Sequence, residues 1–281
     1  MREQRGGALR ILRDKQGSIL NDENAILERW KEHFEELLNP TSASPPRPEL
    51  LIRAETKLDV DEVWRAIHRL KSGKAAGVDE IRPEMLKALG GEGFVWLTRV
   101  FQAAWDSGEA PSDWQTGVVI PLFKKGDKAV CDNYRGITLL SLPGKVYAKV
   151  LESRVRTIVE PILSDEQCGF RPGRSTIDQV FTLQQVGEKA WEYAKPVYAC
   201  FVDLEKAYDR VPRDLLWECL REYGVDQELI RAIVSLYKRC TACVRINGVK
   251  SSSFTVGVGL RQGCVLSPLL FIVYIDRKSV V

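Results

Sequence analysis

The stretch 196–224 constrains the fold of this chain most, because a strand-like apolar segment is followed there by apolar residues at helical spacing. Residues 197–204 follow a proline and are rich in β-branched and aromatic side chains, which predicts a strand that ends near Asp203. Pro212 then precedes apolar residues at helical spacing, and Gly224 ends that run. The sequence therefore predicts a strand-to-helix junction with Asp203 at the rim of a sheet.

A carboxylate held at such a rim is suited to phosphoryl transfer. Mg²⁺ is commonly bound through one or two carboxylates plus the phosphates of a substrate. Taken alone, the motif DLEKAYD at 203–209 is weak evidence, because short motifs often arise by chance. The alternative is that Asp203 or Asp209 is a helix N-terminal acid or a surface charge.

A second motif, LRQGCVLSP at 260–268, strengthens the first. Asn247-Gly248 lies between apolar stretches and predicts a hairpin turn before the motif. Ser267-Pro268 is typical of the start of a helix. Residues 261–263 thus form a loop that enters a helix, where a glycine lets the backbone approach a ligand and exposed amides favour anions. An ordinary polar turn is the alternative.

Together with further blocks, these motifs resemble the reverse transcriptases of non-LTR, LINE-type retrotransposons. The further blocks follow the order of that family and are WKEHFEELLN at 30–39, LKSGKAAGVDEIRPEMLK at 70–87, VVIPLFKKGD at 118–127, NYRGITLLS at 133–141 and QCGFRPGRSTIDQV at 167–180. They cover nearly the whole chain. The resemblance implies an RNA-directed DNA polymerase, which adds deoxynucleotides from their triphosphates to the 3′-hydroxyl of a DNA primer on an RNA template.

The resemblance also implies roles for residues of the two motifs. Asp203 corresponds to the first catalytic aspartate of the palm, which binds Mg²⁺ or Mn²⁺ with help from the backbone carbonyl of Leu204. Tyr208 corresponds to the aromatic residue beneath the incoming sugar, which favours deoxynucleotides, and its alternative is a buried core tyrosine. Gln262 and Gly263 correspond to the loop that packs against the nascent base pair and the nucleotide.

Basic residues of the central blocks correspond to those that grip the triphosphate. These are Lys124, Lys125 and Arg135, and lysine ammonium groups and a forked guanidinium both suit phosphate oxygens. A solvated turn is the alternative for the run KKGDK at 124–128. Gly136 stands where the family often has proline. This departure affects the expected backbone geometry more than the expected role of Arg135.

Three further arginines correspond to contacts with the template or primer. Arg171 and Arg174 lie just before a helix that Ser175 and Asp178 are expected to cap. Arg261 is the third. A basic loop on the surface is the alternative for the first two.

One family block is missing from this sequence. The family carries a later hairpin with Ala-Asp-Asp, which supplies the second metal-binding aspartate, and no Ala-Asp-Asp occurs here. A two-metal displacement needs ligands for ions about 3.5–4 Å apart. We therefore expect little or no polymerase activity from this chain alone. The alternatives are a noncatalytic nucleic-acid-binding remnant of a transposable element, or a decayed element whose fragment folds poorly.

The order of elements, with helices first and a mixture later, predicts an α+β fold. By resemblance this is the fingers and partial palm of a right-hand polymerase, preceded by helices and without a thumb. The expected parts are an N-terminal helical segment over 1–39, a Pro/Ser linker over 40–48, a helical extension over 49–116 and a reverse transcriptase domain over 117–281, with fingers to about 196 and an incomplete palm over 197–281.

Apolar spacing predicts the helices of the N-terminal half. One helix uses Ile26, Trp30 and Phe34 on its buried face. Another, capped by Asp59 in a capping box, has Trp64 on its apolar face, and we expect this tryptophan in the core rather than at a stacking surface. Further helices are expected over 83–89, 97–105, 147–158 and 175–193, with the first clear strand over 117–123.

Composition sets the outer bounds. With 281 residues, 44% hydrophobic and 28% charged, the chain is expected to be globular. A net charge of +3 is small for a nucleic-acid-binding protein, so the basic field must be local, near 124–135 and 171–174. No signal peptide or bilayer-spanning stretch is apparent, which predicts an intracellular protein without a membrane partner, acting in the nucleus by resemblance. Seven cysteines, including the lone CxxC of Cys240 and Cys243, are expected to be reduced thiols rather than a zinc site.

Overall fold

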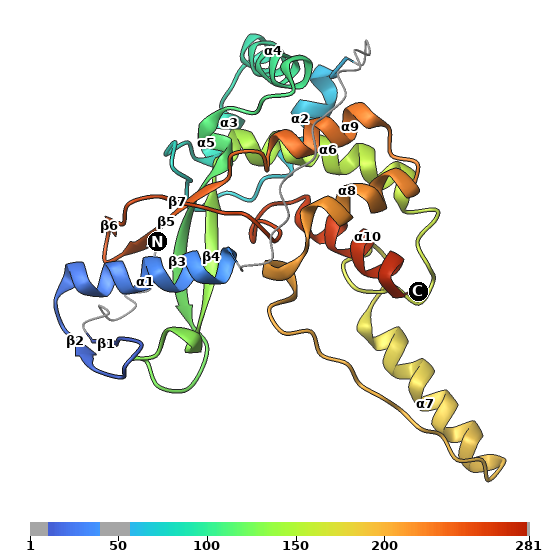
Figure 1. Cartoon of the computed structure of the whole chain (residues 1–281). Coiled ribbons are helices and arrows are strands. Elements are labelled where there is room, and N and C mark those ends of the chain that lie inside the picture. The colour runs from blue at the N-terminus through green and yellow to red at the C-terminus, as the bar shows by residue number, and fades with distance from the viewer. Residues whose placement is uncertain (1–10, 40–56, 280–281) are drawn as a thin grey trace.

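A computed structural model of the chain describes residues 11–39 and 57–279, so the linker predicted over 40–48 lies outside the described residues. The structure combines helices with a mixed sheet (Figure 1). The helices are α1 (Glu23–Leu38), α2 (Val60–His68), α3 (Pro83–Lys87), α4 (Gly91–Ser107), α5 (Ser112–Gln115), α6 (Leu142–Val159), α7 (Thr176–Glu192), α8 (Arg213–Glu222), α9 (Gln227–Ser235) and α10 (Ser267–Ser279). Short 3₁₀ turns cover Cys131–Asn133 and Ala207–Arg210. None of the described helices is long and apolar enough to cross a membrane.

The central sheet has the strand order β4-β3-β5-β6, and β7 also pairs with β5. Its strands are β3 (Thr116–Phe123), β4 (Tyr134–Leu140), β5 (Thr241–Ile246), β6 (Val249–Lys250) and β7 (Phe254–Thr255), while β1 (Leu12–Arg13) and β2 (Ile19–Leu20) form a separate pair. β3 runs antiparallel to β4 and parallel to β5. The expected strand over 117–123 is confirmed. β4 was not predicted, because a glycine and mixed polarity weaken its strand pattern.

Helix α1 lies across this sheet and closes a small core, and the predicted buried face of α1 is confirmed. The Trp30 ring packs edge-on against Tyr134 of β4, with 4.8 Å between ring centroids. Gly136 of β4 faces Phe34, and a Cβ atom at Gly136 would lie 2.7 Å from Phe34 Cε1 and 3.0 Å from Val119 Cγ1. The close approach of α1 therefore leaves no room for a Cβ atom at position 136.

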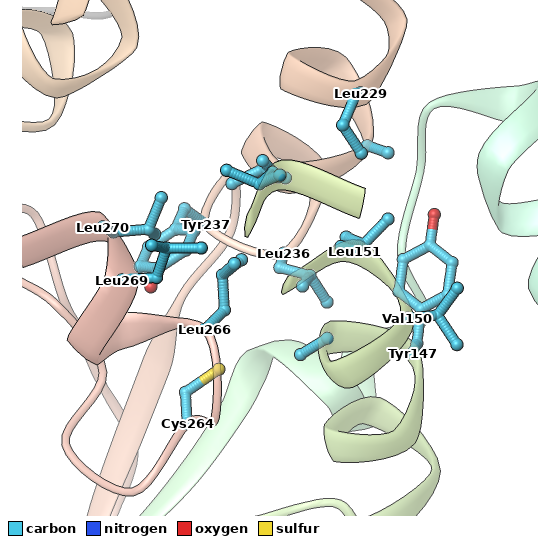
Figure 2. Packing of buried hydrophobic residues seen from close by; sticks show 14 of the residues in the cluster. Tyr147, Val150, Leu151, Leu229, Leu236, Tyr237, Cys264, Leu266, Leu269 and Leu270 are labelled. Carbon is cyan, nitrogen blue, oxygen red and sulfur yellow. The ribbon is translucent and has the colours of Figure 1, made fainter. Parts of the chain in front are cut away.

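The larger core is helical and is centred on α6 (Figure 2). In that view Tyr147, Val150 and Leu151 of α6 face Leu229 of α9 and Leu236 just beyond it. On the other side lie Leu266, Leu269 and Leu270, at and before the start of α10. This packing joins α6, which follows β4, to α9 and α10, which come before and after β5, so one core spans the segments on both sides of α7.

Several local predictions are confirmed. Asp59 and Glu62 form a capping box at the start of α2, and Ser175 and Asp178 form one at α7. Asn247-Gly248 joins β5 to β6, with positive φ angles of 50° and 89° that a tight hairpin of this kind requires. The helix after Pro212 ends before Gly224, which has a φ of 77°.

The strand predicted over 197–204 is wrong. This segment has no regular secondary structure and its residues are exposed, with Phe201 84% exposed. Helix α7, just before it, has no buried residue and extends away from the rest of the molecule (Figure 1). A β-branched, aromatic sequence forms a stable strand only when a neighbouring strand accepts its backbone hydrogen bonds. Among the described strands, none pairs with 197–204.

The core position predicted for Trp64 is also wrong. Val63 and Ile67 of α2 are buried, but Trp64 is 45% exposed. Its ring stacks on His68, one helical turn later, with 4.0 Å between centroids and 29° between planes. Helical spacing alone could not separate the centre of the buried face from its edge.

Candidate nucleotide-binding site

A cleft of about 200 Å³ opens between α1, the β3–β4 hairpin and the 3₁₀ turn Ala207–Arg210. It brings together four residues predicted to contact the nucleotide, namely Lys124, Arg135, Tyr208 and Gln262. They come from three separate segments of the chain, so their convergence is a property of the fold.

The basic wall of the cleft comes from the β3–β4 hairpin. Arg135 lies on β4 opposite Leu122 of β3, and the backbone N–H of Lys124 donates to the Asn133 carbonyl at 2.9 Å, which extends the pairing past the strand end. Both side chains therefore project from one rigid hairpin. Lys125, the next residue, is exposed and does not line the cleft.

A third cation, Lys206, completes this wall, and its position was missed. It has a positive φ of 51° and lies 3.7 Å from Asp132 Oδ1, which also lines the cleft. The sequence offered only a weak signal, because Lys206 lies within the DLEKAYD motif but its nearest charged neighbour there is the acid Glu205, which does not indicate a phosphate site. The cleft thus has three cations facing two carboxylates, those of Asp132 and Asp209.

The buried carboxylate of Asp209 orients the side chains of Gln262 and Arg135 through hydrogen bonds. Gln262 Nε2 donates to Asp209 Oδ1 at 2.7 Å, and Arg135 Nε donates to Gln262 Oε1 at 3.3 Å. Burial raises the pKa of Asp209, while the hydrogen bond from Gln262 and the nearby Arg135 oppose that rise. The sequence suggested only a helix-terminal or surface acid here, because its partner is 53 residues away.

Tyr208 forms the aromatic wall. Its ring stacks on Phe271 of α10, with 4.6 Å between centroids and 16° between planes, and meets Phe170 edge-on at 6.0 Å. Burial raises the pKa of Tyr208 to about 12, so the phenol stays neutral at physiological pH. Tyr208 both packs against the helical core and lines the cleft, so a core position and a position in the cleft are compatible for this residue.

The loop over 261–263 is shaped mainly by contacts within the chain. Gly263 has a φ of 96°, and a Cβ atom there would lie 2.6 Å from the Thr138 carbonyl oxygen of β4. Arg261 is buried, and its guanidinium donates to the carbonyls of Leu236 and Trp114 at 3.2 and 2.5 Å. Ser267 donates to the Arg261 carbonyl at 2.9 Å. Arg261 thus ties loops together in the interior, which does not support the predicted template contact.

The two arginines before α7 differ in how deeply their side chains are buried. The Arg171 side chain is 6% exposed and pairs with Glu160 at 2.9 Å. It also donates to the Ser164 carbonyl at 2.6 Å, so it fastens its loop to the end of α6. Arg174 pairs with Asp165 at 2.5 Å and remains accessible. Of these two, Arg174 has the more accessible side chain, 40% exposed.

Asp203 and Leu204 lie outside the cleft. Both are exposed in the 197–204 segment, and neither lines the cleft. Across residues 11–39 and 57–279, no group of three or more His, Cys, Asp or Glu side chains is placed to hold a metal ion. Asp203 therefore belongs to no such group, and the residues as placed do not fit a two-metal site.

His33 of α1 is another cleft residue that the sequence analysis missed. Burial lowers its pKa, nearby Asp132 raises it, and Lys206 lowers it. The block WKEHFEELLN signalled a family segment but not a wall of this cleft. Helix α1 thus belongs to the site as well as to the core.

Comparisons with known proteins identify a matching family and several relatives. The family model described as "Reverse transcriptase (RNA-dependent DNA polymerase)" matches residues 123–279, more than half of the 281 residues. The chain is 28% identical over 278 residues to the transposon TX1 uncharacterized 149 kDa protein of Xenopus laevis, covering 92% of this chain and 21% of that protein. It is 28% identical over 219 residues to the RNA-directed DNA polymerase from mobile element jockey of Drosophila melanogaster, covering 76% and 24%.

A third relative is the putative 115 kDa protein in type-1 retrotransposable element R1DM of Drosophila melanogaster, 32% identical over 216 residues, covering 74% of this chain and 20% of that protein. The chain thus spans about a fifth to a quarter of the length of these relatives. The mixed sheet flanked by helices is consistent with a reverse transcriptase fold. This chain belongs to the reverse transcriptase family of nucleotidyltransferases, among the RNA-directed DNA polymerases of non-LTR retrotransposons.

Proposed function

We propose that this chain is the nucleotide-binding part of an RNA-directed DNA polymerase, which adds deoxynucleotides to a DNA primer on an RNA template. The observation that carries the proposal is the convergence of Lys124, Arg135, Tyr208 and Gln262 on one cleft. A triphosphate is the ligand that best matches clustered ammonium and guanidinium groups beside an aromatic wall.

In this proposal each wall of the cleft meets one part of the nucleotide. Lys124, Arg135 and Lys206 face the phosphates. Tyr208 lies beside the sugar, where a rigid ring disfavours a 2′-hydroxyl, and Gln262 lies towards the base pair. The stack of Tyr208 on Phe271 supports this role, because a ring held on its far side cannot retreat from the added hydroxyl.

We further propose that the hairpin β3–β4 belongs to the fingers and that α8 to α10 belong to the palm. Reverse transcriptases generally use divalent metal ions, and we propose Mg²⁺ or Mn²⁺ at Asp203 and the Leu204 carbonyl when a second acid is present. The exposed position of Asp203 supports the expectation that this chain alone has little or no polymerase activity. By family, the site of action is proposed to be the nucleus.

Adjacent lysines provide the test of the nucleotide site. The affinity for a fluorescent deoxynucleoside triphosphate is measured for Lys124→Gln and Lys125→Gln. Both changes remove one charge from the same hairpin, but only Lys124 lines the cleft. We expect roughly tenfold weaker binding for Lys124→Gln, since charge-assisted hydrogen bonds contribute about 1.5–3 kcal/mol. Equal loss in both variants would show that the cleft is not the site.

Primer extension tests the limit on activity. The purified chain is incubated with an RNA template, a DNA primer, deoxynucleotides and Mg²⁺. We expect no more than trace extension. Robust cDNA synthesis would overturn that part of the proposal and would also exclude the alternative, a noncatalytic nucleic-acid-binding remnant.

A further inference from the structure

His33 lines the nucleotide cleft, and it comes from a helix that precedes the segment matched by the family model. The chain has two histidines, and the other, His68, lies on α2 and does not line the cleft. Helix α1 is anchored by its buried residues, which include Trp30 and Phe34. The backbone of His33 therefore has a fixed position beside the cleft.

Two aromatic rings of the same helix hold the imidazole of His33. The Trp30 ring meets it edge-on, with 5.9 Å between ring centroids and 86° between planes. The Phe34 ring also meets it edge-on, at 5.2 Å and 74°. Within residues 11–39 and 57–279, neither imidazole nitrogen has a hydrogen-bond partner. The ring is thus held by apolar contacts, and its nitrogens are available to a ligand in the cleft.

The charges around His33 place it at the phosphate end of the cleft. From beyond α1, Asp132 and Lys206 act on it most strongly, and their side chains lie 3.7 Å apart. Lys206 is one of the three cations proposed to face the phosphates. The other charged side chains around the imidazole are Arg29 and Glu36 on α1 and, across the cleft, Lys124, Arg135 and Asp209. Burial raises the pKa of the cleft phenols Tyr134 and Tyr208, so both stay neutral near pH 7.

The cleft carries little net charge for a ligand as anionic as a triphosphate. Its three cations face two carboxylates, those of Asp132 and Asp209. Asp132 lies at the phosphate end, where a carboxylate repels the ligand. A proton on His33 adds a fourth cation at that end. Histidine is suited to this task because its ordinary pKa of about 6.5 lets it gain a charge near neutral pH.

Protonation of His33 is linked to binding. In the free protein, burial lowers the pKa of His33, Lys206 and Arg29 lower it further, and Asp132 and Glu36 oppose them. The imidazole is therefore mostly uncharged at neutral pH. A triphosphate in the cleft brings negative charge towards the imidazole, which favours its protonated form. By reciprocity, a protonated imidazole favours the triphosphate.

We propose that His33 is a phosphate-binding residue of the nucleotide cleft, whose imidazole takes up a proton from solvent when a triphosphate binds and then donates to a phosphate oxygen. This role rests on the proposed function. It adds a contact from α1 to a site whose other phosphate contacts come from the β3–β4 hairpin and from Lys206. The nucleotide affinity of this chain then rises as the pH falls from 8 to 6.

The test measures the affinity for deoxythymidine triphosphate, with Mg²⁺ present, at several pH values between 6 and 8. The terminal phosphate titrates in the same range, so the wild type is compared with His33→Gln, which cannot carry the proton. We expect the gain in affinity from pH 8 to pH 6 to be roughly fivefold larger in the wild type, because a charge-assisted hydrogen bond is added.

A permanent charge provides the converse variant. His33→Arg is expected to bind at pH 8 about as tightly as the wild type binds at pH 6, with no more pH dependence than His33→Gln. The matched control is His68→Gln, which removes the other histidine from a site outside the cleft. We expect this control to keep the pH dependence of the wild type. Thermal midpoints recorded at each pH show that every variant is folded where its affinity is compared.

The possible failures are distinguishable. Triphosphate binding with the same pH dependence in the wild type and His33→Gln would overturn the role of His33 and leave the nucleotide site intact. Loss of the pH dependence in His68→Gln, with its retention in His33→Gln, would assign the proton to the other histidine and would also overturn it. If the wild type binds no triphosphate at any of these pH values, the proposed function fails, and the role of His33 fails with it.

Discussion

Asp209 and Gln262 form a hydrogen bond of 2.7 Å, in which the amide of Gln262 donates and the buried carboxylate accepts. This bond fixes the direction of the amide, since a carboxylate accepts but cannot donate. The amide oxygen then faces Arg135, which donates to it at 3.3 Å. Asp209 thus acts through Gln262 on the position of Arg135.

Replacement of Asp209 tests this arrangement. In Asp209→Ala the Gln262 amide loses its acceptor, so we expect nucleotide affinity to fall about fivefold and the free energy of unfolding to fall by about 1–3 kcal/mol. Asp209→Asn keeps an oxygen acceptor and should retain most of the affinity. Comparing affinity with thermal midpoint separates positioning from folding. Equal affinity losses for the alanine and asparagine variants would contradict the positioning role.

The pH dependence of stability should carry a contribution from His33. Burial lowers the pKa of His33 in the folded protein below its ordinary value of 6.5. The unfolded chain therefore binds the proton more readily, and stability is fully present above about pH 6.5 and is lost as pH falls towards the folded pKa. We expect urea unfolding between pH 5 and 8 to show this loss, and His33→Gln to reduce it. An unchanged slope in the variant would exclude His33 as its source.

The contact between Gly136 and Phe34 predicts a stability cost. A Cβ atom at Gly136 would lie 2.7 Å from the Phe34 ring, so Gly136→Ala should lower the free energy of unfolding by about 1–3 kcal/mol. Phe34→Leu should relieve the clash, so the two substitutions together should cost less than their sum. Additive costs in a double-mutant cycle of urea unfolding would show that α1 does not press on β4.

Arg171 and Arg174 form a natural pair for comparison. Arg171→Gln breaks a partly buried ion pair and should lower the free energy of unfolding by about 1–3 kcal/mol. Arg174→Gln should change stability by less than about 1 kcal/mol, because its pair is exposed. Any loss of template affinity at unchanged stability should come from Arg174→Gln. The reverse pattern would show that Arg171, not Arg174, reaches the template.

Local signals in the sequence predicted local structure well. The Asp59–Glu62 capping box and the Asn247-Gly248 turn depend on atoms a few residues apart, so their residue types determine the backbone. The family resemblance found Lys124, Arg135, Tyr208 and Gln262, which the structure brings to one cleft. Their roles as nucleotide contacts stay predictions.

Most of the failures depend on what packs against a segment, which its own residues do not reveal. The segment 197–204 has the composition of a strand but no partner strand in the described chain. Trp64 has helical spacing but lies at the edge of the buried face. Asp209 depends on Gln262, which a turn, two helices and a hairpin separate from it. Periodicity reports which face is apolar, but it does not report what covers that face.

The most direct test of the account compares Arg135→Gln with Asp203→Asn in deoxynucleoside triphosphate binding, measured by titration calorimetry with Mg²⁺ present. Arg135 lines the cleft and Asp203 does not. The account predicts roughly tenfold or greater loss of affinity for Arg135→Gln and wild-type affinity for Asp203→Asn. Wild-type binding by Arg135→Gln, with binding abolished in Asp203→Asn, would contradict it.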